Sequence, residues 1–304
     1  MRRRHIANAA AVLPLAIGLA SSAPSWHGDT TTPDSTVSPA DSALKLLCPL
    51  PFDAMGQAHP IDESCPAEGD ATADTPQGMQ NAAKNSFCET GNAIQVSFSD
   101  FTQLQQLADG HHIPYGTANR LPKDRSLLRA LYPDFPSGAL GEGTMVRLSA
   151  VVIDAHYSNV SSGESVNCKT PGAATNDIHI VLGETADADT CDSVTAEMSP
   201  HFRPELWTPE TLNRVAGRPM RFTGPLFFDA SHKPCSVDHA VRTSPPRRSL
   251  FEIHPVYSVD VCSVTADAGT VIPVTSCDAG DDSKWVSLQT WLGEDKEVDG
   301  SGGQ

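Results

Sequence analysis

The stretch DIHIVL (residues 177–182) begins with strict alternation: Ile178, Ile180 and Leu182 fall on one side of an extended chain. Residues two apart in a β-strand share a face, so this pattern predicts a strand with one buried apolar face. Comparable runs lie before and after it in the chain, at 145–153, 193–198, 220–228 and 250–261. Together they predict a five-stranded β-fold over residues 141–262.

A short helix is predicted between the third and fourth of these strands. Thr208-Pro209-Glu210 opens it, because proline suits the first position of a helix, and Gly217 ends it. The order of elements is then β-β-β-α-β-β, which is the order of an OB-like barrel. We therefore expect a mainly β protein built on an OB-like five-stranded barrel with one helix between strands 3 and 4. A generic β-sandwich is the alternative.

The chain before the barrel divides into three parts. Residues 1–23 combine a basic start, an apolar run and small residues before Ala23, which is typical of a signal peptide; the adjacent arginines also allow a twin-Arg signal. Residues 24–43 are rich in Ser, Thr, Pro and Asp and are expected to form a disordered spacer. Residues 44–140 are expected to form a loop-rich lead-in packed on the core, with short helices near 76–87, 101–109 and 126–132 and with Thr75 as the cap of the first.

The end of the chain, residues 263–304, is acidic and rich in Gly and Ser, and we expect a flexible tail. Docking of Trp285, Leu288 and Leu292 as a turn or two of helix is the alternative. No stretch after the signal peptide is apolar and long enough to predict a membrane span, so we expect a periplasmic or extracellular protein.

The net charge and the absence of several motifs argue against some classes of function. The formal net charge of the 304 residues is −16, which argues against sequence-blind nucleic-acid binding by the whole molecule. The sequence contains no P-loop, no dinucleotide-binding glycine pattern and no HExxH helix. Its eight cysteines predict up to four disulfides, for which we expect the pairs Cys65–Cys88 and Cys262–Cys277.

The predicted strands also place polar side chains together. Opposite the apolar faces lie Asp177 and His179, Thr195 and Glu197, and Glu252 and His254, on three strands that neighbour one another in an OB barrel. Carboxylates beside imidazoles suit Zn or Mn. This pattern predicts a divalent metal held by His179, His232 and His254, with Glu197 or Glu252 as the general base of a hydrolase. The alternative is a polar face that is simply in contact with water.

A basic segment offers a different chemistry. Residues 201–250 carry eight basic and four acidic residues, with aromatic residues interleaved. Charge combined with stacking suits single-stranded nucleic acid or another polyanion, and we expect ligand contacts from Asp177, Arg203, Trp207 and Arg221. The alternative is that Trp207 belongs to the core and that the arginines pair with acidic residues elsewhere.

Five sequence strings carry a resemblance to a known group of proteins: Glu164–Cys168, Asn176–Ile180, Glu197–Pro204, Phe228–His232 and Phe251–Val256. In this order they resemble a group of bacterial exported proteins with a D-x-H, E-x-[ST]-P, D-x-x-H and [WF]-E-I-H-P series. The resemblance covers roughly 141–262 and implies an OB-like domain and export, but no reaction. His201 stands where the group usually has arginine, which weakens an anion-binding role there, and Phe251 stands where it usually has tryptophan.

Three functions follow from these observations. The first is an exported binding module for an unknown ligand, either anionic or polymeric. The second is a metal-dependent hydrolase acting on a phosphodiester. The third is a structural envelope protein whose polar groups form a hydrogen-bond network without catalysis.

Overall fold

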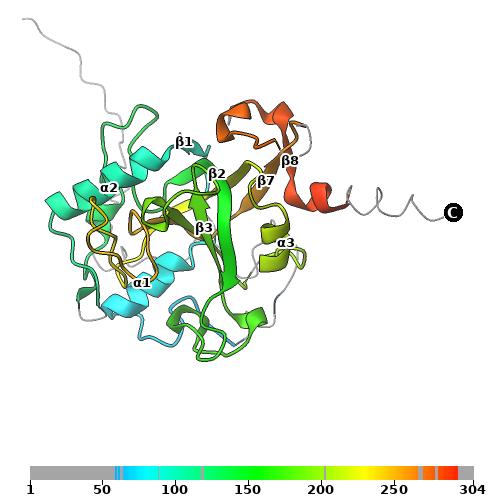
Figure 1. Ribbon diagram of the computed structural model, residues 1–304. Helices are drawn as coiled ribbons and strands as arrows, with labels where there is room; N and C mark the ends of the chain where they lie inside the picture. The colour runs from blue at the N-terminus through cyan, green and yellow to red at the C-terminus, as the bar shows by residue number, and fades with distance from the viewer. Residues whose placement is uncertain are drawn as a thin grey trace, which may run out of the picture. The chain divides into compact units, whose positions relative to one another are not determined.

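Five strands form a closed barrel in the computed structural model (Figure 1): β2 (Met145–Tyr157), β3 (Ile178–Gly183), β4 (Val194–Met198), β5 (Met220–Phe228) and β6 (Phe251–Ile253). Around the barrel β2 pairs with β3, β3 with β4, β4 with β6, β6 with β5, and β5 with β2 again. The β4–β6 pair is parallel and the other four pairs are antiparallel. With α3 (Pro209–Arg214) between β4 and β5, this confirms the predicted OB-like barrel.

The structure describes residues 59, 61, 64–87, 89–117, 120–201, 203–265, 270–277 and 280–293. All of them belong to one compact unit. The predicted signal peptide and the predicted spacer lie outside the described residues. No helix among the described residues is long and apolar enough to cross a membrane.

The predicted last strand, 250–261, is two strands rather than one. β5 pairs with β6 through Leu226–Phe228 and with β7 (Ser258–Cys262) through Met220–Thr223. The chain bends between β6 and β7, so the alternation is interrupted there. Val256 is buried, whereas Tyr257 is only half-buried and donates its hydroxyl to the carbonyl of Ser86 in the lead-in.

The main chain of this bend packs against Gly224 in β5. A Cβ atom there would lie 2.4 Å from the carbonyl oxygen of Pro255, which is main chain and cannot rotate away. We therefore expect Gly224→Ala to lower the free energy of unfolding by about 1–3 kcal/mol, the usual cost of overpacking a core. Urea denaturation measures this. Gly110→Ala is the control, because nothing lies within 4 Å of a Cβ at that position.

The lead-in contributes α1 (Pro76–Lys84), the short strand β1 (Ile94–Val96) parallel to β2, and α2 (Phe98–Gly110). Thr75 caps α1 as expected, since its hydroxyl oxygen accepts the Gly78 amide. α2 begins three residues earlier than predicted, because Ser97 is its N-cap and Asp100 accepts the Ser97 amide. The remaining helical turns are short 3₁₀ segments: Ser126–Leu128, Ser165–Asn167, Ala173–Thr175, Thr190–Asp192, Val274–Ser276 and Asp282–Lys284.

The flexible tail expected from residue 263 does not hold for residues 285–292. β8 (Trp285–Ser287) pairs antiparallel with β7, and Trp285, Leu288 and Leu292 are buried. Leu288 and Leu292 join the main core, whereas Trp285 packs with Cys262, Ile272 and Cys277 in a smaller cluster. The apolar spacing of the segment outweighed its acidic and glycine-rich surroundings.

Three disulfides connect described residues: Cys65–Cys168, Cys191–Cys235 and Cys262–Cys277. The expected Cys262–Cys277 pair is confirmed. The expected Cys65–Cys88 pair is wrong, because Cys65 reaches across 103 residues to the turn after Ser165–Asn167. Cys48 and Cys88 lie outside the described residues. Disulfides in this number are typical of a non-reducing compartment.

Candidate functional site

The polar side chains that alternation placed on β3, β4 and β6 do lie together. His179 is directly opposite Glu197 in the β3–β4 pair, and Ala196 is opposite Ile253, which brings the neighbouring His254 close to Glu197. They do not form a water-facing surface, however. Asp177, His179, Glu197, Glu252 and His254 are each 5% exposed or less.

The lead-in accounts for this burial, because α1 lies over the polar face. The main-chain carbonyl of Lys84, the last residue of α1, is 2.6 Å from Nδ1 of His254. Asn81 donates to the Ser165 hydroxyl, and the next residue after the helix, Asn85, donates to the Val166 carbonyl. Strand alternation identifies the polar side of the sheet, but a distant segment of the chain determines whether that side meets water.

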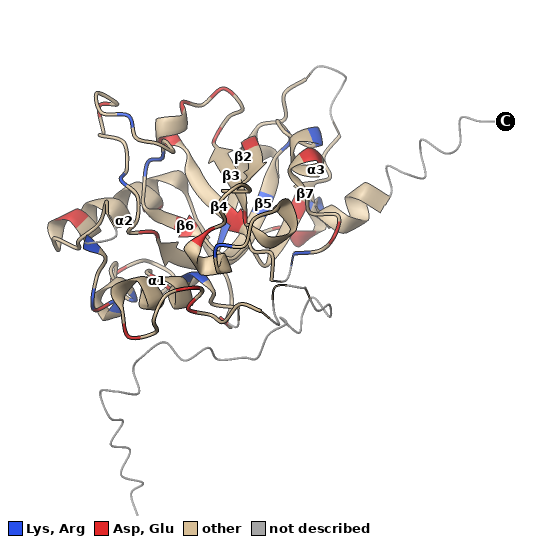
Figure 2. Ribbon diagram, turned by 90° about the horizontal axis from the view of Figure 1, so that it is seen from below, with Lys and Arg blue, Asp and Glu red and all other residues tan. Residues whose placement is uncertain are grey.

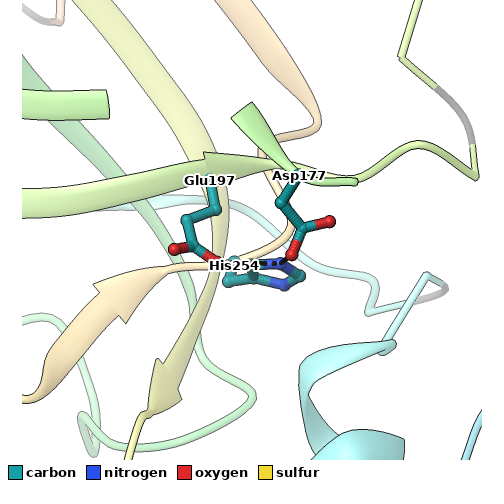
Figure 3. A group of neighbouring side chains, drawn as sticks. All are labelled: Asp177, Glu197 and His254. Carbon is teal, nitrogen blue, oxygen red and sulfur yellow. Dashed lines mark hydrogen bonds and ion pairs between the residues drawn. The ribbon is translucent and has the colours of Figure 1, made fainter. Parts of the chain in front are cut away.

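Asp177, Glu197 and His254 converge at the centre of this buried face (Figure 3). One ligating atom from each lies within 4.8 Å of the others. Nε2 of His254 is 3.3 Å from Oδ2 of Asp177 and 3.5 Å from Oε2 of Glu197. The ammonium of Lys84 also reaches this point, 2.6 Å from Oε2 of Glu197 and 3.2 Å from Oδ2 of Asp177.

The charges of this group determine the ionisation of its carboxyls. Burial alone would raise the pKa of Asp177, but the Lys84 ammonium and His254 outweigh it and lower that pKa to about 2. Burial is likewise outweighed at Glu197, whose pKa lies well below its ordinary value because of Lys84 and His179. The carboxylates in turn raise the pKa of Lys84 against its own burial. Two carboxylates and one ammonium are therefore charged together inside the protein.

His254 has its two nitrogens in different surroundings. Nδ1 faces a main-chain carbonyl, which can only accept, so Nδ1 carries a proton. Nε2 faces two carboxylate oxygens, which are also acceptors once ionised. Nε2 and these two oxygens lie close enough together to bind one metal ion.

Sequence reasoning missed three members of this site: Lys84, Glu164 and Asn167. Asn167 donates to Oδ1 of Asp177, at 3.2 Å, and lies 3.5 Å from Oε2 of Glu164. Glu164 is half-buried, and burial first, together with the neighbouring carboxylates, raises its pKa to about 8. Lys84 and Glu164 lie outside the strands whose alternation marked the polar face; Glu164 and Asn167 belong to a string that carries the resemblance, but no role followed from it.

The three histidines predicted as metal ligands separate in the structure. Only His254 belongs to the three-residue group, which is the one such group found among the described residues. His179 contacts the other oxygen of Glu197, with Nδ1 3.0 Å from Oε1. Nε2 of His232 lies 3.3 Å from Asp229.

Glu252, predicted as a general base, occupies a separate buried cluster. Arg247 Nη1 lies 3.0 Å from Oε2 of Glu252 and 3.5 Å from Oδ2 of Asp229. Burial first, then the carboxylates of Glu197 and Asp229, raises the pKa of Glu252 well above its ordinary value. Its buried pairing with Arg247 places Glu252 outside the group of Asp177, Glu197 and His254.

The residues expected to bind a polyanion have partners within the fold. Arg203 donates to the carbonyls of Asn176 and Ala173, and its guanidinium lies over the ring of Tyr157. Arg221 pairs with Asp260 and Asp282. Trp207 is 2% exposed and belongs to the main core. Figure 2 shows basic and acidic positions interspersed along the described chain.

Comparisons of this chain with protein-family models, with curated proteins and with solved structures find no match. The site must therefore be interpreted from its own geometry.

Proposed function

We propose that this protein is an exported binding module that takes up a divalent transition-metal ion at Asp177, Glu197 and His254. The observation that carries this proposal is the convergence of three ligating atoms within 4.8 Å, on the strand face where OB-like barrels bind their ligands. Two ionised carboxylates and an imidazole form a donor set that suits Zn or Mn.

The surroundings of the three residues support a metal site. Metal-binding histidines usually donate their second nitrogen to a carbonyl or carboxylate, which orients the ring, and His254 makes this contact with the Lys84 carbonyl. Asn167 holds the second oxygen of Asp177, and His179 the second oxygen of Glu197. The ligand atoms that face the centre are those left over: Oδ2, Oε2 and Nε2.

The ammonium of Lys84 is the competitor of a metal ion at this point. It contacts the same Asp177 and Glu197 oxygens that would bind the ion. Uptake of a metal therefore requires the side chain of Lys84 to move outward. This side chain is 12% exposed, so it already reaches solvent. Carboxylates in this number also favour a cation over the anionic ligand suggested by the basic segment.

Replacing the competitor tests the proposal. We expect wild-type protein to bind about one equivalent of zinc or manganese, and Lys84→Met to bind it at least ~10-fold more tightly because a positive charge leaves the site. Asp177→Asn should abolish stoichiometric binding while keeping a side chain of the same size. Isothermal titration with the metal salt and metal analysis by mass spectrometry provide the readouts. Lys123→Met, at an exposed position, is the matched control.

The proposal is wrong if neither the wild type nor Lys84→Met binds a stoichiometric ion. If Lys84→Met folds only with added zinc, that result supports the site as strongly as a titration would. A gain in affinity that persists in the Lys84→Met/Asp177→Asn double variant would place the metal elsewhere.

The hydrolase hypothesis depends on the same ion. A phosphodiester is anionic and would be repelled by the ionised carboxylates of Asp177 and Glu197 unless a metal offsets their charge. Glu164, whose pKa is raised, is half-buried and more exposed than either of them. The structural hypothesis leads to the opposite expectation, since carboxylates that already pair with Lys84 need no metal.

A further inference from the structure

A cleft beside the end of α2 differs from the carboxylate site in its charge. It has a volume of about 640 Å³ and is lined by Asp109, His112, Ile113, Pro114, Tyr115, Arg120 and Lys233. This volume falls within the range of small-molecule sites, about 300–1,000 Å³. Although the protein as a whole is acidic, basic side chains outnumber acidic ones in this cleft.

Two basic side chains at the cleft have no polar partner among the residues that the structure describes. Arg120 and Lys233 are exposed, and neither side chain forms an ion pair or hydrogen bond with any residue that the structure describes. This distinguishes them from the arginines at 203, 221, 242, 247 and 248, each of which has a carboxylate or carbonyl partner. Unpaired cations that line a concave surface suit an anionic ligand.

The aromatic wall of the cleft is held in place. The Tyr115 hydroxyl donates to Oδ1 of Asp109 at 2.9 Å, and its ring packs edge-on against buried Phe228 with centroids 6.4 Å apart. Gln105 donates to the same Asp109 oxygen, whereas Oδ2 makes no hydrogen bond within the described chain. The cleft thus offers a fixed ring for stacking and one carboxylate oxygen that can accept from a hydroxyl.

Lys233 is positioned by close packing on the opposite loop. The Gly116 amide donates to the Ala230 carbonyl at 2.8 Å, which joins the loop of Tyr115 to the segment that carries Lys233. A Cβ at Gly116 would lie 2.7 Å from Cε of Lys233, so the lysine stem occupies the space that the glycine leaves. The two loops that form the cleft are therefore joined by a main-chain hydrogen bond and by the packing of a side chain.

We propose that this cleft binds a phosphate monoester of a hydroxyl-bearing ring compound. Arg120 and Lys233 contact the phosphate, Tyr115 stacks on the ring, and Oδ2 of Asp109 accepts from a ring hydroxyl. A nucleoside monophosphate and a sugar phosphate share this chemistry. The site is independent of the metal site, because it uses none of the same residues.

The test is equilibrium binding to the full chain with four probes: adenosine 5′-monophosphate, glucose 6-phosphate, inorganic phosphate and adenosine. We expect at least one of the two ring phosphates to bind ~10-fold or more tightly than inorganic phosphate and adenosine, and the better one identifies the source. Arg120→Ala and Lys233→Ala should each weaken that binding ~10-fold or more, as loss of a charged hydrogen bond implies. Raising the salt from 0.05 to 0.5 M should weaken it too.

Lys123→Ala removes a nearby exposed charge that does not line the cleft and should leave binding unchanged. Gly116→Ala displaces Lys233 and should weaken binding without removing any charge. The proposal is overturned if neither ring phosphate binds saturably, if inorganic phosphate binds as tightly as both, or if Arg120→Ala and Lys233→Ala leave the affinity unchanged. Circular dichroism confirms that each variant is folded.

Discussion

Lys84→Met, in metal-free buffer with chelator, should lower the free energy of unfolding by about 3–5 kcal/mol. That is the usual cost of removing one partner from a buried ion pair and leaving the other charge uncompensated. Here the ammonium leaves two such charges, on Asp177 and Glu197, 1–5% exposed and close to each other. Methionine retains most of the volume, so the loss is electrostatic rather than a cavity.

Urea denaturation of both proteins measures this difference. Lys123→Met removes the same charge at an exposed position and should stay within about 0.5 kcal/mol of the wild type. A difference below 1 kcal/mol for Lys84→Met would show that the carboxylates do not depend on this ammonium.

The pH dependence of stability offers a second readout of the same contact. The pKa of Asp177 is lowered from 3.8 to about 2, mainly by the Lys84 ammonium acting against burial. A lowered pKa stabilises the fold above the unfolded-state value, and this stabilisation disappears as the pH falls from about 4 to 2. In Lys84→Met the decrease over that interval should be smaller, because the carboxyl has lost its main stabilising charge.

Removal of the Cys65–Cys168 disulfide should have an effect of similar size. It closes a loop across 103 residues, for which the chain-entropy relation gives about 4.7 kcal/mol; the Cys262–Cys277 disulfide spans 15 residues and corresponds to about 3 kcal/mol. The double variants Cys65→Ala/Cys168→Ala and Cys262→Ala/Cys277→Ala are a matched pair. Denaturant unfolding under oxidising conditions compares them.

We expect the longer loop to show the larger loss for a second reason. Cys65 precedes α1 and Cys168 follows the turn that contacts Asn81 and Asn85, so this disulfide fastens the lead-in over the polar face. If the Cys262–Cys277 variant were the less stable of the two, non-covalent contacts of α1 would be sufficient to hold the lead-in.

Alternation predicted the barrel because the inward residues are near one another in sequence. Ile178, Ile180 and Leu182 are all fully buried, as are Val194, Ala196 and Met198 on the next strand. The caps of the short helices are also local signals, and Thr75 and Thr208 cap α1 and α3 as expected. The close disulfide Cys262–Cys277 belongs with these, since it joins neighbouring segments.

The sequence predicted which residues of the site lie together but not that they are buried. The relation of Asp177, Glu197 and His254 followed from strand order and period, and the structure brings them together. Their burial did not follow, because alternation separates the two faces of a sheet without saying what packs on each. The roles expected for Arg203, Trp207 and Arg221 stay predictions, as does each proposed metal role, although their partners in the fold are now known.

By itself, then, the sequence determined the first four strands of the barrel, where α1 and α3 begin and which polar side chains share a face, since each depends on contacts a few residues apart. Only the tertiary structure decided that α1 covers that face, that Lys84 pairs with its carboxylates, that Cys65 joins Cys168 and that the last predicted strand bends into β6 and β7. These features depend on contacts between residues distant in the chain, which no local pattern encodes.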